Sequence, residues 1–97
     1  MVTKEAVIEA LKTVLDPELL LDVWFLGLIY DISIEDESFV NIKMTLTTPA
    51  CPAGPEMVLS VRERVAALEG VEDVYVTLCF DPPWEPNEEV KALLGFI

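Results

Sequence analysis

Apolar and polar residues alternate along three stretches of the chain, as is typical of β-strands with one buried face. The alternation runs through residues 28–34, 40–47 and 74–80. The polar segment 35–38 between the first two stretches fits a turn, so these two are predicted to form an antiparallel hairpin. The apolar positions are Leu28, Tyr30, Ile32 and Ile34, then Val40, Ile42, Met44 and Leu46, then Val74, Val76, Leu78 and Phe80.

Three further stretches carry helical signals. Thr3 can cap a first helix, which is predicted to stop near Leu15 or Asp16 because Pro17 disfavours helical geometry in the residue before it. A second helix is predicted from Pro55 to a terminator at Gly70, and a short last helix from Asn87 through Leu94. The apolar stripe of the second helix is Val58, Val61, Val65 and Leu68.

The predicted order is therefore α-β-β-α-β plus a C-terminal helix. With 97 residues, 53% of them apolar, the chain can bury one core and is predicted to form a single domain over residues 1–97. The fold class expected is α+β, a two-layer α/β sandwich with the helices on one face of a small mixed sheet and the other face open and semi-polar.

Charge and composition exclude several classes of partner and of site. The net charge of −12 makes nucleic acid and anionic membranes poor partners. The longest uncharged stretch, Val23 to Tyr30, is too short to span a membrane, and the charged N-terminus does not resemble a signal peptide. The cytoplasm is the expected compartment. The chain contains no histidine, which excludes histidine metal sites and histidine general bases.

Cys51 is the first candidate for chemistry. It lies in a proline-rich loop just before the predicted second helix, where the helix N-terminus favours a thiolate. A buried structural cysteine is the alternative, but such residues usually lie within strands or helices. Cys79 falls in the third predicted strand, and a packed small side chain is the better interpretation for it.

Other candidates surround this loop in the sequence. Thr45 and Thr47 share the polar face of the second strand and Thr48 opens the loop. Their hydroxyl groups could line a pocket near Cys51, or the threonines could reflect β-propensity on a solvent-facing strand. Asp16 and Glu18 flank Pro17 and could bind a cation, although such residues more often cap turns or face solvent.

Tryptophan provides the last candidates. Trp84, between Pro83 and Pro86, could pack the final loop onto the core or act as an exposed anchor for a partner. Trp24 and Phe25 are more typical of core or subunit-interface residues.

Taken together, five motifs resemble the small iron–sulfur assembly family that includes the SufT-like and PaaD-like proteins. The resemblance spans nearly the whole chain. The motifs are Asp16-Pro17-Glu18-Leu19, Asp22-Val23, Leu26-Gly27-Leu28-Ile29-Tyr30, Met44-Thr45-Leu46-Thr47 with Cys51-Pro52, and Asp81-Pro82-Pro83-Trp84.

The resemblance implies an α/β domain and a role in maturing iron–sulfur proteins, in partnership with the assembly machinery and client apo-proteins. It implies that Cys51 is the functional residue and metal ligand, with the acidic pair Asp16 and Glu18 and the threonines Thr45, Thr47 and Thr48 around one pocket.

The chemistry of clusters limits the mechanism. Iron–sulfur clusters are usually held by four thiolates, and this chain has two cysteines. We therefore expect an adaptor or transient carrier and not an enzyme, with a homodimer or a client cysteine completing a transiently bound cluster. The alternatives are an interaction module without cluster binding and, less favoured without a histidine base, an enzyme with Cys51 as nucleophile.

Overall fold

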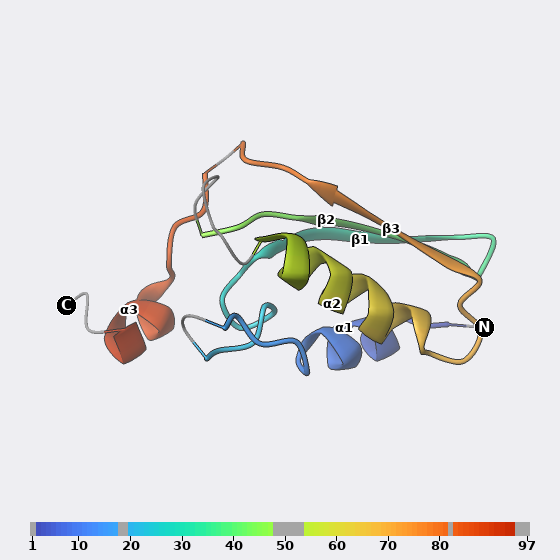
Figure 1. Cartoon of the computed structure of the whole chain (residues 1–97), viewed down its shortest axis with the longest axis horizontal. Coiled ribbons are helices and arrows are strands. Elements are labelled where there is room, and N and C mark those ends of the chain that lie inside the picture. The colour runs from blue at the N-terminus through green and yellow to red at the C-terminus, as the bar shows by residue number, and fades with distance from the viewer. Residues whose placement is uncertain (1, 18–19, 48–53, 82, 95–97) are drawn as a thin grey trace.

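The computed structural model describes residues 2–17, 20–47, 54–81 and 83–94. Its elements follow in the predicted order (Figure 1). They are α1 Lys4–Leu11, β1 Ile29–Glu35, β2 Phe39–Met44, α2 Gly54–Ala66, β3 Asp73–Leu78 and α3 Glu88–Leu94. No helix within these ranges has both the length and the apolar character required to cross a bilayer.

The three strands form one mixed sheet in the order β1-β2-β3. β1 and β2 make the predicted antiparallel hairpin, in which Ile32 lies opposite Ile42. β3 then pairs with β2 in parallel, with Val76 opposite Ile42. A parallel neighbour requires a crossover, and α2 lies in the connection that provides it. β2 is thus the central strand, and β1 and β3 are the edges.

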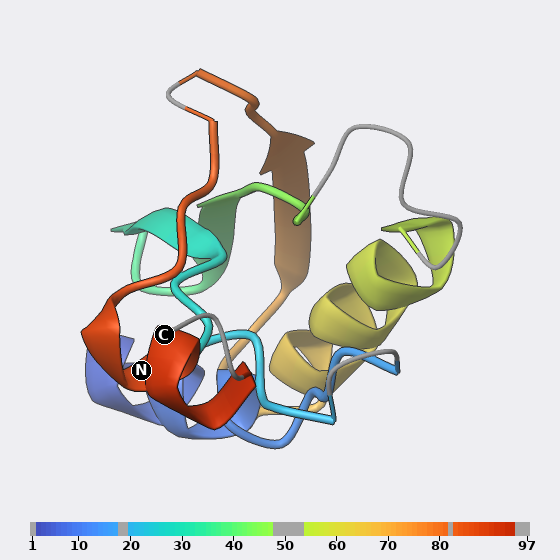
Figure 2. The same ribbon diagram turned by 90° about the vertical axis from the view of Figure 1, so that its left-hand side faces the viewer.

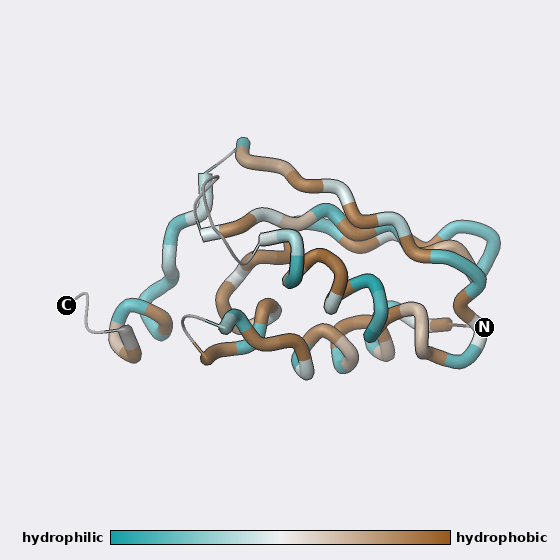
Figure 3. The backbone as a smooth tube through the Cα atoms, in the orientation of Figure 1, coloured by the Kyte–Doolittle hydropathy of each residue, from teal (hydrophilic) through white to brown (hydrophobic). Residues whose placement is uncertain are grey.

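The helices α1 and α2 pack on the same face of this sheet, so the two-layer prediction is confirmed (Figures 1 and 2). Apolar residues follow the strands and α1, whereas the turn between β1 and β2 is hydrophilic (Figure 3). Between the layers lies one core, which includes Leu11 and Val7 of α1, Ile42 and Met44 of β2, and Val61 of α2, all at most 1% exposed. The opposite face carries exposed polar residues and is open.

The first helix is shorter than predicted and ends at Leu11. The Thr13 hydroxyl donates a hydrogen bond to the Ala10 carbonyl at 2.6 Å, and the chain turns there. Beyond this turn the backbone no longer makes helical hydrogen bonds. It bonds to a later segment, where the Val23 N–H donates to the Val14 carbonyl at 2.9 Å. The predicted end near Leu15 or Asp16 is wrong because Pro17 sets only an upper limit on the helix.

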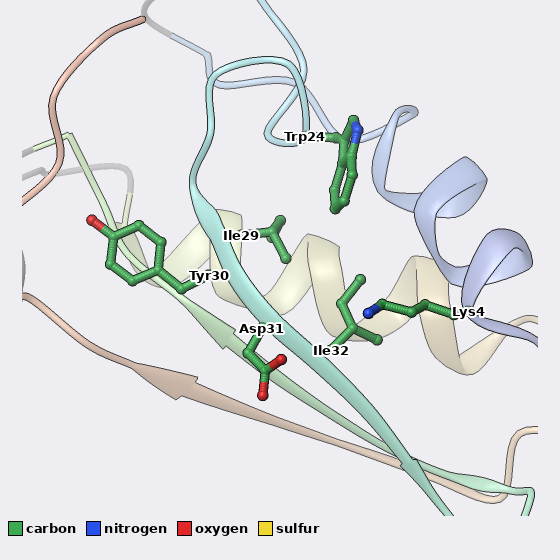
Figure 4. Close-up of a pocket in the computed structure, with 6 residues that line it drawn as sticks. All are labelled: Lys4, Trp24, Ile29, Tyr30, Asp31 and Ile32. Atoms are coloured by element: carbon green, nitrogen blue, oxygen red, sulfur yellow. The ribbon is translucent and has the colours of Figure 1, made fainter.

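A bulge in β1 also differs from the predicted alternation. Ile29 lies opposite Met44 and Asp31 opposite Lys43, so Tyr30 has no partner in the β2 register. Ile29 and Ile32 consequently point toward α1, and Tyr30 points to the other side of the strand (Figure 4). The prediction that Tyr30 shares the buried face of Ile32 is wrong, because one inserted residue reverses the alternation.

Helix α2 begins one residue before the predicted Pro55, at Gly54. A Cβ atom at this glycine would lie 2.7 Å from Leu46 Cδ1, so glycine allows the first turn to approach the segment that follows β2. Val61 and Val65 are fully buried, as predicted, and Met57 joins them. The helix ends at Ala66, short of the predicted terminator Gly70. Gly70 lies in the turn that follows, with φ of 92°, a left-handed conformation that suits glycine.

Candidate functional site

Of the predicted site residues, Thr45 and Thr47 follow β2 and the Asp16 loop lies beside the first turns of α2, at the end of the sheet where β2 and β3 finish and α2 begins. This end of the sheet faces the viewer in Figure 2. We refer to this region, defined by Asp16, Thr47, Gly54 and Leu78, as the site end. Cys51, Thr48 and Glu18 lie outside the described residues. Their described neighbours in the sequence lie at the site end, because Cys51 precedes Gly54 by three positions and Thr48 follows Thr47 directly.

Thr45 and Thr47 follow the last residue of β2. Thr45 is fully buried, and its N–H donates to the Leu28 carbonyl at 2.8 Å. Its hydroxyl oxygen lies 3.4 Å from the Leu46 carbonyl, to which it donates. The interpretation of Thr45 as a solvent-facing strand residue is therefore wrong, because this segment is covered. Thr47 is half-buried and is the last described residue before the loop that carries Cys51.

Asp16 occupies a tight loop whose position is set by the backbone. Its N–H donates to the Leu21 carbonyl at 2.9 Å, and its carbonyl accepts from the Leu20 N–H at 2.8 Å. The side chain is 1% exposed, so Asp16 is not a solvated loop residue. Pro17 lines a small hollow together with Glu56 and Met57 of α2. This places the Asp16 loop beside the first turns of α2.

Cys79 lies just beyond β3 and is half-buried. Its N–H donates to the Met44 carbonyl at 2.8 Å, and its thiol donates to the Asp81 carbonyl at 3.2 Å. The packed small side chain stays a prediction, and β3 ends at Leu78, one residue before Cys79.

An apolar groove opens at the site end between α2 and the end of β3. Its volume is about 740 Å³, and Leu59, Leu78 and Phe80 line it with exposed fractions of 54%, 41% and 39%. The sequence pattern predicts Leu78 and Phe80 on the buried face of a strand. They do lie on the helix side, but α2 does not extend over them, which leaves them open to solvent. Leu59 lies outside the predicted helical stripe, which was the sequence signal for its exposure.

The Trp84 side chain packs against the core and is half-buried. Its Nε1–H donates to the Leu26 carbonyl at 2.7 Å, which ties the segment before α3 to the loop before β1. Gly27 follows in a left-handed conformation with φ of 76°. Trp24 and Phe25 also pack against the core. The intramolecular bond of Trp84 favours the packing interpretation, and its role as a partner anchor stays a prediction.

Replacing Trp84 by phenylalanine is expected to lower the free energy of unfolding by about 1–2 kcal/mol, because the Leu26 carbonyl loses its donor. Urea denaturation measures this change. Tyr75→Phe, which removes a hydroxyl group from an exposed ring, is the control and is expected to change stability by less than about 0.5 kcal/mol. Unchanged stability in Trp84→Phe together with weaker partner binding would contradict the packing interpretation.

A second hollow lies away from the site end, between the start of α1 and β1 (Figure 4). It holds only about 100 Å³ and is lined by Lys4, Trp24, Ile29 and Asp31, among others. No cysteine lines it. Across the described ranges, no three cysteine, aspartate or glutamate side chains come together in an arrangement that could hold a metal ion.

Comparison with known proteins finds relatives that are similar over nearly the whole chain. The chain is 40% identical over 98 residues to an Fe-S protein maturation auxiliary factor of Porphyromonas gingivalis, covering 98% of this chain and 93% of that protein. It is 37% identical over 95 residues to an iron-sulfur cluster carrier protein of Synechocystis, covering 98% of this chain but 27% of that longer protein. A solved structure, a conserved hypothetical protein of Thermotoga maritima, is 47% identical with a TM-score of 0.87, covering 97% of this chain and 95% of that one.

The family model described as iron-sulfur cluster assembly protein matches residues 4–78. This range runs from the start of α1 to the end of β3 and contains the whole sheet with both packed helices. The resemblance drawn from the sequence motifs is thereby confirmed. The chain belongs to the iron–sulfur cluster assembly protein family.

Proposed function

We propose that this protein is an iron–sulfur cluster assembly factor that acts as an adaptor or transient carrier in the maturation of iron–sulfur proteins. The observation that carries the proposal is the position of Cys51. In the sequence it lies three positions before Gly54, the first residue of α2, in a chain whose relatives are named maturation factors and cluster carriers. The cluster is cargo, and we assign the protein no catalytic role of its own.

Thiolate chemistry supports Cys51 as the residue that contacts the cargo. The first N–H groups of a 13-residue helix and its dipole favour negative charge close to its N-terminus. A thiolate is the form of cysteine that binds iron. Because the chain has two cysteines and a cluster usually takes four thiolates, other ligands must come from a client or a second copy of the chain. Incomplete ligation by one chain suits release of the cargo.

The surrounding polar residues are proposed to shape the cysteine loop. Asp16 is buried in a loop beside the first turns of α2, and Glu18 is two positions further along the chain. Thr47 and Thr48 lead into the cysteine loop, and buried Thr45 anchors their segment through the Leu28 carbonyl. We propose that this set positions Cys51.

The partners proposed are the iron–sulfur assembly machinery and client apo-proteins, with a homodimer as one way to bring two Cys51 thiolates together. The proposed compartment is the cytoplasm. A second candidate function, an interaction module without cluster binding, is favoured by the exposed apolar groove at the site end. Both candidates place the contact with partners near Cys51, and they differ in whether the cluster itself is held.

Anaerobic reconstitution with ferrous iron and sulfide distinguishes these candidates. A carrier is expected to show cluster absorbance and bound iron in the wild type and in Cys79→Ser, and to lose both in Cys51→Ser, because serine is a poor iron ligand. Ultraviolet–visible spectra and iron counting provide the readout. Equal iron in wild type and Cys51→Ser would contradict ligation through Cys51. Absence of a cluster from all three proteins would favour the interaction module.

A further inference from the structure

The apolar groove at the site end continues along the whole length of β3. A further hollow of about 410 Å³ adjoins the groove between α2 and β3, and Val74 and Val76 of the strand line it. Val58 and Arg62 of α2 line both hollows. The two therefore form one channel, which we call the α2–β3 groove.

β3 is an edge strand of the sheet (Figure 2), and its residues Val74 and Val76 line this groove. The Cys79 N–H bonds to the Met44 carbonyl of β2, and alternate residues of a parallel strand direct their N–H and C=O groups to opposite sides. The backbone groups of Val76 and Leu78 therefore point away from β2. No described strand pairs with them, because β3 is the edge of the sheet.

The edge is blocked at its beginning and open toward the site end. The Asp73 carboxylate accepts the Val74 N–H at 2.8 Å, which occupies the first outward-pointing donor. Val76 and Leu78 remain. Leu78 lines the groove together with Leu59 and Phe80, whose side chains are exposed, and Val76 lines it together with Val58 and Arg62. An unpaired strand edge beside an apolar groove is the geometry in which an extended peptide adds as a further strand.

Charge limits what can occupy the groove. Arg62 lies at its middle, with one guanidinium nitrogen 3.7 Å from the Asp73 carboxylate and its side chain 58% exposed. This long contact leaves donors of the guanidinium open to a further carboxylate. As the occupant of this groove, a client segment is favoured over a second copy of the chain, because a copy would bring its own net charge of −12 against the same charge here.

We propose that the α2–β3 groove binds an extended segment of a client polypeptide, which pairs with the backbone of Val76 and Leu78. Apolar side chains of the segment pack against Leu59 and Phe80, and an acidic one faces Arg62. This inference rests on the proposed function, since it names the surface that receives the client. The groove ends at Gly54, three positions from Cys51, so a segment bound there holds the client beside the cysteine loop.

A synthetic peptide tests the groove without any cluster. The probe is the acetylated and amidated peptide Lys-Thr-Val-Thr-Asp-Thr-Val-Thr-Lys, whose side-chain order is the same in both directions. Its control has the same side chains but carries N-methyl groups on alternate residues, which block pairing along one edge or the other in two separate versions. Binding is followed by NMR, and by hydrogen exchange at the Val76 and Leu78 amides.

The unmodified peptide is expected to bind, to shift the resonances of α2 and β3, and to slow exchange at both amides at least tenfold. One methylated version should bind at least tenfold more weakly. Equal binding by the unmodified peptide and both methylated versions would overturn strand addition. Slow exchange of both amides in the free protein would also overturn it, because the edge would already be covered by another part of the chain or by a second copy.

Variants then locate the contact. Leu59→Ser is expected to weaken binding about tenfold, and Leu93→Ser, which alters another exposed leucine, on α3, is expected to leave it unchanged. Arg62→Glu should weaken binding and should prefer a peptide with lysine in place of the aspartate. Equal effects of the two leucine changes would overturn the assignment to this groove.

Failure of this inference is distinguishable from failure of the proposed function. The peptide assay contains no iron or sulfide and does not depend on Cys51. Loss of peptide binding with normal reconstitution would overturn only the groove as the client site. Normal peptide binding with full client maturation by Cys51→Ser would contradict the cargo role of Cys51 and leave the groove as a docking surface.

Discussion

Cells in which Cys51→Ser replaces the wild-type protein are expected to lose at least tenfold in the activity of an iron–sulfur enzyme that depends on this factor. Cys51 lies three positions before the first residue of α2 in the sequence, and a helix N-terminus favours a thiolate. Serine preserves the size of the side chain but removes the sulfur that binds iron. The measurement is the activity of the client per amount of client protein, compared at equal levels of the assembly factor.

Cys79→Ser is the matched control, because the two changes remove the same atom from the two cysteines of the chain. The Cys79 thiol donates to the Asp81 carbonyl, a bond that a serine hydroxyl can also make. Client activity should therefore remain near the wild-type level. A large loss in Cys79→Ser with none in Cys51→Ser would reverse the assignment of the functional cysteine.

The fold could be predicted from the sequence because its main determinants are local. The two-residue period of β2 and the polar segment 35–38 define the hairpin, and the helical stripe that includes Val61 and Val65 defines α2. Parallel pairing of β3 follows from the intervening helix, since a crossover returns the chain in the same direction. These features require no knowledge of contacts between distant residues.

The features that were missed depend on contacts between distant residues. The end of α1 is set by pairing of Val14 with Val23, and the bulge at Tyr30 is defined only by the register against β2. The bond from Trp84 to Leu26 joins residues 58 positions apart. The pattern of apolar and polar residues along the chain does not indicate which distant residues will contact each other.

In the site, too, some features have a local sequence signal and others depend on contacts between distant residues. Cys51 could be singled out because a cysteine among prolines before a helix has a local signature. The groove could not, because the exposure of Leu78 and Phe80 depends on where α2 begins relative to the end of β3. An alternating strand pattern predicts which face a residue occupies but not whether another element covers it.

Leu28→Ala is expected to lower the free energy of unfolding by about 2–5 kcal/mol, because Leu28 is fully buried and its truncation leaves a cavity. The position is also a junction: the Leu28 carbonyl accepts the Thr45 N–H at 2.8 Å, and its N–H donates to the Val23 carbonyl at 3.1 Å. Urea denaturation at fixed temperature measures the loss. For a small domain with a stability of about 5–15 kcal/mol, this is a large fraction.

Leu59→Ala is the control for this change, because it deletes the same atoms from a leucine that is 54% exposed. We expect it to alter the free energy of unfolding by less than about 0.5 kcal/mol. A comparable loss in the two variants would mean that Leu59 is buried in solution, which would close the α2–β3 groove. A large loss for Leu28 alone would mean that the groove leucine contributes little to folding, so that its exposed surface is available for binding a client.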